Sequence, residues 1–184
     1  MNNNDVGSFR KVTLCMAMLF CYALLSAQVK WEDFKYDNAS FKVSSPGMFK
    51  VITKELATSM GVITTTNYSI SIKEHNPNFL YTINHIMYED GTLSKDSIAM
   101  INALMEETLD GVIESNKTKL IYKTENTSEE YQGLIFRCMN PAGIVIKGKI
   151  IVRGDHAYIL MVYTHNDKSL NLDMDRFLDS FQLL

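Results

Sequence analysis

Alternating apolar and polar positions fill most of the chain between residues 36 and 90. Such alternation places every second side chain on one side of the backbone, which is typical of a half-buried β-strand. We predict a strand, a tight turn at Asp37-Asn38 and a second strand that Pro46 ends. Three more strands are predicted in FKVITKEL, VITTTNYSISIKE and NFLYTINHIMYED, and the first two of these form a hairpin about residues 59–61.

The pattern then changes to the period of a helix. Ser94 is a natural N-cap, and Asp96 would lie in the first turn, where the helix dipole favours a negative charge. Mostly apolar residues follow at three- and four-residue steps: Ile98, Ile101, Leu104, Met105, Thr108, Leu109 and Val112. We therefore predict an amphipathic helix near residues 94–115 that packs on the rest of the protein by this stripe.

Four strand-like segments and a short helix complete the chain. The segments are TKLIYKTE, EYQGLIFRCMN, GIVIKGKIIVRG and DHAYILMVYTHN, and short turns separate them. Consecutive strands joined by short turns pair antiparallel, which predicts a meander. The last segment, LDMDRFLDSFQLL, can be capped by Asn171 or Asp173, and four of its apolar side chains share one helical face: Met174, Phe177, Leu178 and Phe181.

These elements predict an α+β fold, in which an antiparallel β-sheet is flanked by a long middle helix and a C-terminal helix. No repeat, low-complexity segment or linker rich in Pro, Gly or Ser divides the 184 residues. A chain of this length is enough for one domain with an ordinary core. We therefore expect a single domain after the N-terminal leader described next.

The first 27 residues differ in composition from the rest of the chain. Arg10 and Lys11 precede an apolar run from Val12 to Leu25, and small residues close it, as in a secretory signal peptide. The run is shorter than the roughly 20 apolar residues that a membrane-spanning helix needs, and no cysteine follows a small residue as in a lipoprotein signal. We predict cleavage near Ala27, a periplasmic or extracellular domain of residues 28–184, and no stable membrane anchor. An uncleaved anchor is the alternative.

The charge balance argues against nucleic acid as a partner. The chain has 18 basic and 21 acidic side chains, and the leader contains Arg10, Lys11 and Asp5, so the mature charge is 16 minus 20, or −4. Binding to nucleic acid rests on a basic face, so we expect no nucleic acid partner. The mature chain keeps Cys138 alone, so it has no internal disulfide.

Two short motifs and their order along the chain suggest a family. FKVSSP (Phe41 to Pro46), a long helix after the first strands, a glycine-punctuated meander and the closing RFLDSF (Arg176 to Phe181) together resemble the PsbP and Mog1-like domains. The resemblance implies an antiparallel sheet flanked by helices, with the C-terminal helix packed on it. It also implies accessory and partner-binding roles more than catalysis, and it supplies no shared catalytic residues.

No local motif indicates a catalytic, cofactor-binding or metal-binding residue. The sequence lacks Gly-x-Ser-x-Gly, Ser-x-x-Lys, His-Glu-x-x-His and Cys-x-x-Cys. None of the histidines, at positions 75, 85, 156 and 165, has a local partner suited to a metal, and we interpret His85 as a partly buried residue with one satisfied nitrogen. Residues 167–178 resemble a calcium loop, but Leu172 and Leu178 stand where its glycine and glutamate should be.

The tripeptide Arg153-Gly154-Asp155 is an adhesion motif in some proteins. Here it lies where one predicted strand must reverse into the next, and Gly and Asp are the residues that a two-residue hairpin loop favours. We interpret it as a turn.

One row of cations is the candidate partner surface. In GIVIKGKIIVRG, Lys147, Lys149 and Arg153 share one strand face, and the opposite face is apolar. We expect the cationic face to be a solvated outer face, with a partner-binding surface as the alternative. Gly148, between apolar neighbours, indicates close approach by another element, for which the C-terminal helix is a candidate.

Two functional hypotheses follow. The first is a secreted or periplasmic, non-catalytic accessory domain that binds an unknown protein or small ligand. The alternative is an unrecognised extracytoplasmic hydrolase with a site built from scattered residues. A cleft that holds a histidine within hydrogen-bond reach of a carboxylate or hydroxyl would favour the hydrolase.

Overall fold

The computed structural model describes residues 30–184 except 59–60, 74–75 and 94–96. The predicted signal peptide and the predicted cap Ser94 lie outside the described residues. The strands are β1 (Glu32–Tyr36), β2 (Phe41–Ser45), β3 (Lys50–Thr58), β4 (Gly61–Ser71), β5 (Asn78–Met87), β6 (Lys119–Glu125), β7 (Gln132–Met139), β8 (Ile144–Arg153), β9 (His156–His165) and β10 (Gln182–Leu183). The α-helices are α2 (Ile98–Ser115) and α3 (Leu172–Ser180), and short 3-10 turns span Asp37–Ala39 and Asn166–Lys168.

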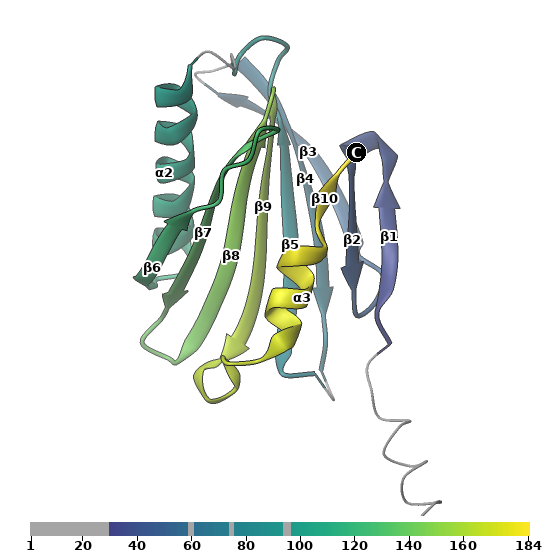
Figure 1. The fold of residues 1–184 in the computed structure, drawn as a ribbon, viewed down its shortest axis with the longest axis vertical. Coiled ribbons are helices and arrows are strands. Elements are labelled where there is room, and N and C mark those ends of the chain that lie inside the picture. Colours follow the sequence, from purple (N-terminus) through teal and green to yellow (C-terminus); the bar gives the residue numbers. More distant parts are fainter. Residues whose placement is uncertain (1–29, 59–60, 74–75, 94–96) are drawn as a thin grey trace, which may run out of the picture. The chain divides into compact units, whose positions relative to one another are not determined.

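Seven strands form one antiparallel sheet in the order β3-β4-β5-β9-β8-β7-β6. The predicted meander β6 to β9 and the β3–β4 hairpin are confirmed. A smaller sheet has the order β1-β2-β10, because the last residues pair with β2. Figure 1 shows α2 on one face of the large sheet, and α3 with the small sheet on the other. The α+β prediction is therefore confirmed.

The two faces of the large sheet bury two separate apolar clusters. On the α3 face, Phe41 and Phe177 pack with Tyr81, Tyr158 and Leu160. On the α2 face, Leu109 packs with residues such as Phe136 and Ile150. Both faces of β8 and β9 are thus covered, and Ile150 and Ile151, which point to opposite faces, are each 1% exposed. This double cover explains why the central strands are apolar at successive positions.

Helix α2 differs in part from its prediction. Four residues of the predicted stripe are buried, namely Ile101, Met105, Leu109 and Val112. Leu104 is only partly buried, and Ile98 is 54% exposed, so the predicted burial of these two residues is wrong. The helix packs on β7 and β8, and Ile98 is its first residue.

Helix α3 confirms the predicted face and cap. Met174, Phe177 and Leu178 are buried, as is Phe181 just after the helix. The side chain of Asn171 accepts a hydrogen bond from the backbone N–H of Met174 at 3.2 Å. The chain beyond Ser180 does not continue as a helix, however, because Gln182 pairs with Lys42 of β2.

No helix in the part of the chain that the structure describes is long and apolar enough to cross a lipid bilayer.

Candidate functional site

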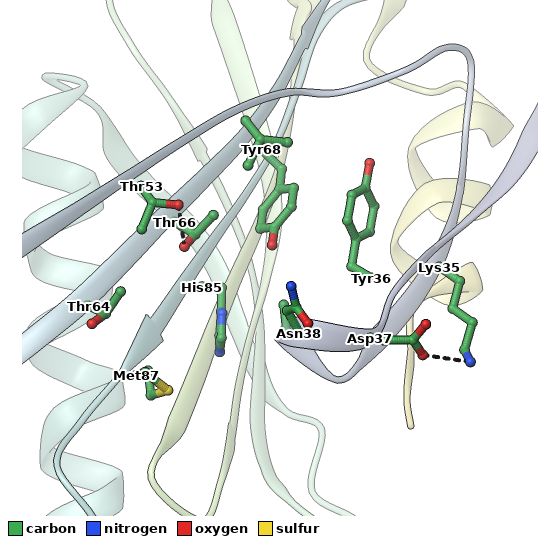
Figure 2. A pocket seen from close by; sticks show the side chains of 12 residues that line it. Lys35, Tyr36, Asp37, Asn38, Thr53, Thr64, Thr66, Tyr68, His85 and Met87 are labelled. Atoms are coloured by element: carbon green, nitrogen blue, oxygen red, sulfur yellow. Dashed lines mark hydrogen bonds and ion pairs between the residues drawn. The ribbon is translucent and has the colours of Figure 1, made fainter.

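A cleft of about 600 Å³ lies between the tip of the β1–β2 hairpin and the face of β3, β4 and β5. We call it the hairpin cleft, and Figure 2 shows its side chains. The hairpin contributes Lys35, Tyr36, Asp37, Asn38 and Ala39. The sheet contributes Val51, Thr53, Thr64, Thr66, Tyr68, His85 and Met87.

The sheet side of the cleft follows from strand alternation and register. Alternate residues of each strand point to the same face, so Thr64, Thr66 and Tyr68 of β4 all line the cleft. The register places Thr66 beside both Thr53 and His85. The hydroxyl oxygens of Thr53 and Thr66 are 3.1 Å apart and form a hydrogen bond, which Figure 2 marks. The result is a row of hydroxyl groups beside aromatic rings.

The hairpin tip is held on the sheet by buried contacts. Ser40 adopts a left-handed conformation, with φ of 53°, and its N–H donates to the carbonyl oxygen of Asp37 at 3.1 Å. Ala39 is 2% exposed, and the Tyr158 hydroxyl donates to its carbonyl oxygen at 2.9 Å. Burial raises the pKa of Tyr158 to about 12, so its phenol stays protonated and can donate this bond.

The charged groups at the rim of the cleft neutralise each other. The Lys35 ammonium lies 2.6 Å from a carboxylate oxygen of Asp37, and both side chains are exposed to solvent. An exposed pair of this kind adds little stability. Its effect on the cleft is to leave no net charge among the lining residues.

His85 is a buried titratable group of the cleft. Its ring contacts those of His156 and Tyr158, whose centroids lie 5.2 and 4.8 Å from its own and 6.3 Å from each other. Its Nε2 is 2.9 Å from Nδ1 of His156, so one ring nitrogen has a hydrogen-bond partner. Burial, and then the charge that His156 can carry, lower the pKa of His85 to about 4. His85 is therefore neutral at neutral pH, and the interpretation of one satisfied nitrogen is confirmed.

Sequence reasoning missed the pairing of the two histidines, which lie 71 positions apart. The register places His85 opposite Tyr158 and Met87 opposite His156, so the histidines are diagonal neighbours on β5 and β9. Only knowledge that β5 pairs with β9 could have revealed this contact. Within the described residues, no group of three or more His, Cys, Asp or Glu side chains is arranged to hold a metal ion.

The structure places the three predicted surface cations away from the hairpin cleft. Lys147 forms an ion pair with Asp175 of α3. The side chain of Lys149 is buried beneath the ring of Tyr131, with its Nζ 5.8 Å from the ring centroid. Arg153 donates a hydrogen bond from Nη1 to the carbonyl oxygen of Leu184 at 3.2 Å.

The expectation of a solvated outer face at these cations is wrong, because α3, the ring of Tyr131 and the C-terminal residues cover it. A contact of Lys147, Lys149 or Arg153 with a partner protein stays a prediction. The expected neighbour of Gly148 is also wrong. A β-carbon on Gly148 would overlap the ring of Phe136 and approach the carbonyl oxygen of Leu160, so the close approach comes from the adjacent strands β7 and β9 and not from the C-terminal helix.

The Arg153-Gly154-Asp155 segment forms the predicted turn. Arg153 pairs with His156, and Gly154 has a φ of 53°. The Asp155 carboxylate accepts hydrogen bonds from the backbone N–H groups of Gly91 and Leu93, each at 2.7 Å. These bonds lower the pKa of Asp155 and use its oxygens to hold the loop after β5.

Comparison with known proteins finds similarity in fold and none in sequence. No family model matches the chain, and no curated protein matches it in sequence. Among solved structures, the cyanobacterial PsbP (CyanoP) from Synechocystis sp. PCC 6803 superimposes with a TM-score of 0.56 at 8% sequence identity, over 85% of this chain and 94% of that protein. Identity this low reports on the fold alone. The chain has a PsbP-like fold, as its two short motifs predicted.

Proposed function

We propose that this protein is an exported, non-catalytic binding domain that takes a small, uncharged, hydrogen-bonding ligand into the hairpin cleft. The observation that carries the proposal is the lining of the cleft. The volume of the cleft lies within the roughly 300–1,000 Å³ typical of small-molecule sites. Its polar groups are the threonine hydroxyls, the Asn38 amide and the tyrosines, and its one ion pair is internally neutralised.

The state of His85 supports binding over hydrolysis. A general base works best when its pKa is near the working pH, whereas His85 has a pKa of about 4. Its hydrogen-bond partner is His156, and no hydroxyl or carboxylate of the described residues bonds to it. The hydrolase hypothesis needs such a nucleophile and base pair. The PsbP-like fold is in keeping with an accessory role, as the sequence resemblance implied.

A pair of threonine variants tests the ligand site. Thr66→Val removes a hydroxyl from the cleft at nearly constant shape, and Thr65→Val is its matched control, because Thr65 points to the opposite sheet face and lines a different cleft. We would record backbone amide NMR spectra of the labelled protein with a panel of neutral saccharides, nucleosides and amides. We expect a binder to shift the resonances of Thr53, Thr66 and His85.

Loss of one neutral hydrogen bond should weaken that binder by about 2- to 12-fold in Thr66→Val, while Thr65→Val stays like wild type. Binders that shift only resonances outside the cleft, or that respond equally to both variants, would contradict the proposed site.

Export has its own test, which does not depend on the ligand. The polar start, the basic pair and the short apolar run predict that the exported protein begins at Gln28 or within a few residues of it. N-terminal sequencing of the protein from the periplasm or medium measures this directly. Recovery of protein that still contains Met1, in the membrane fraction, would overturn it.

A further inference from the structure

The edge strand β3 has an outer side with which no described strand pairs. It is the first strand of the seven-stranded sheet, so β4 pairs with one side only. All nine of its residues are exposed, and no other described strand pairs with its outer side. Alternate backbone N–H and C=O groups of an edge strand point outward, where they can pair with another extended chain.

The two faces of β3 differ in chemistry. Val51 and Thr53 line the hairpin cleft, so the even-numbered residues point to the opposite face. There Lys54 lies between Ile52 and Leu56, which are 42% and 48% exposed. Leu56 is opposite Ile63, which packs on the α2-face cluster, and this contact confirms the assignment of the face.

Lys54 has no electrostatic partner in the described part of the chain. Its neighbour across the strand pair is Thr65, which contacts the Lys54 backbone carbonyl oxygen and not the ammonium group. No other described side chain forms an ion pair with that ammonium. The cation is therefore available to a group that approaches from the open side of β3.

We infer that β3 is a docking edge for an extended peptide segment of a partner protein, in which an acidic residue is flanked at both second neighbours by apolar residues. Residues opposite each other on adjacent strands have β-carbons about 4.5–5.5 Å apart, and opposite charges there attract. An added strand would place its acidic side chain beside Lys54 and its two apolar side chains beside Ile52 and Leu56. Backbone pairing would provide affinity, and this three-residue pattern would provide selectivity.

Lysine on an edge strand also hinders unselective pairing between sheets. Lys54 therefore has a double effect, since it disfavours a cationic or purely apolar strand and favours an acidic one. This inference does not depend on the ligand of the hairpin cleft, because Lys54 points to the other sheet face.

A charge exchange tests the inference. The probes are two labelled peptides, Thr-Val-Thr-Glu-Thr-Val-Thr and the same peptide with lysine in place of glutamate. We expect the glutamate peptide to bind wild-type protein and to bind Lys54→Glu at least about fivefold more weakly. The lysine peptide should show the reverse preference. Fluorescence anisotropy measures both affinities, and amide hydrogen exchange should show new protection in β3.

Lys119→Glu is the matched control, because Lys119 is an exposed lysine at the start of the opposite edge strand β6. It makes the same change of net charge and should leave both affinities unchanged. Three results would overturn the inference: no binding of either peptide to wild type, equal effects of the two variants, or self-association of wild type through β3 in size-exclusion chromatography. The last result would assign the edge to a second copy of this chain.

Discussion

At the scale of single residues, the most informative side chain is His85. It is 5% exposed, and its ring forms a cluster with those of His156 and Tyr158. Tyr158 in turn holds the hairpin tip through Ala39. A charge on His85 would therefore be placed in a buried stack that supports one wall of the cleft. This position links the protonation state of one residue to the stability of the fold.

We predict that this protein loses stability as the pH falls from about 6.5 towards 4. The unfolded chain binds a proton at His85 near its ordinary pKa of 6.5, whereas the folded protein binds it only near 4. In that window the unfolded state holds more protons, so the free energy of unfolding decreases as the pH falls. The loss attributable to His85 should reach roughly 3 kcal/mol. Urea unfolding at a series of pH values measures it.

A substitution separates His85 from the other acid-sensitive groups. His85→Phe keeps an aromatic ring in the stack and removes the titration, so the slope between pH 6.5 and 4 should become shallower. His165→Gln is the control, since His165 is exposed at the end of β9. The bonds to Asp155 are lost only below the usual carboxyl pKa of 3.8, because its pKa is lowered further. An unchanged slope in His85→Phe would show that the buried stack does not determine acid sensitivity.

At the scale of elements, the long helix tests how well burial follows from sequence periodicity. We predict that Leu109→Ala, at a side chain that is 1% exposed, lowers the free energy of unfolding by about 2 to 5 kcal/mol. Leu104→Ala should have a smaller effect because Leu104 is only partly buried. Glu106→Ala should change little, since its ion pair with Lys123 is exposed. Thermal or urea unfolding of the three variants gives the order, and equal effects would reject the assigned face.

Local elements could be predicted from sequence because their periods of about two and 3.6 residues are local properties. The meander, the turn at Gly154 and the cap at Asn171 were predicted in this way, and the structure confirms them. The cation row was misinterpreted for a physical reason. Lysines in a strand usually indicate a solvent-exposed face. Lys147 instead forms an ion pair with Asp175, which lies 28 positions later on α3. Contacts at such separation leave no local signal.

The hairpin cleft could not be predicted from the sequence either, because it also depends on contacts between distant segments. Each of its strands was predicted, but the cleft exists only because the β1–β2 hairpin lies over β3, β4 and β5. The pairing of β5 with β9 joins segments separated by α2 and three strands, and it brings His85 to His156. The PsbP and Mog1-like resemblance supplied the fold but no site residues, so it could not have located either feature.

At the scale of the whole molecule, the C-terminal segment connects the two sheets. Phe177 and Phe181 are 0% and 6% exposed, and Phe181 stacks on Phe41 of the small sheet with ring centroids 5.2 Å apart. Strand β10 pairs with β2, and Ser180 accepts a hydrogen bond at its side-chain oxygen from the backbone N–H of Ser44 at 2.9 Å. The segment therefore covers the large sheet and anchors the hairpin that forms one wall of the cleft.

We predict that truncation before Arg176 abolishes the folded monomer. Burial of Phe177 and Phe181 should stabilise the protein by roughly 1.5 to 3 kcal/mol each, a large share of the about 5 to 15 kcal/mol by which a domain of this kind is stable. The truncation would also expose Tyr81, Tyr158 and Leu160, which form the centre of the α3-face cluster. An exposed apolar sheet face recruits other chains, so we expect aggregation or a poorly folded product. Circular dichroism and size-exclusion chromatography of the truncated protein measure the outcome.

A milder variant distinguishes loss of packing from loss of chain length. Phe177→Ala keeps every backbone contact of α3 and removes one buried ring, so it should lower the free energy of unfolding by about 3 to 5 kcal/mol. Asp179→Ala, on the exposed side of the same helix, should change it little. If the truncated protein were a soluble monomer with an unchanged melting temperature, α3 would be a detachable tail. The hairpin would then be held on the large sheet by its own contacts alone, through Tyr158 and the aromatic rings around Phe41.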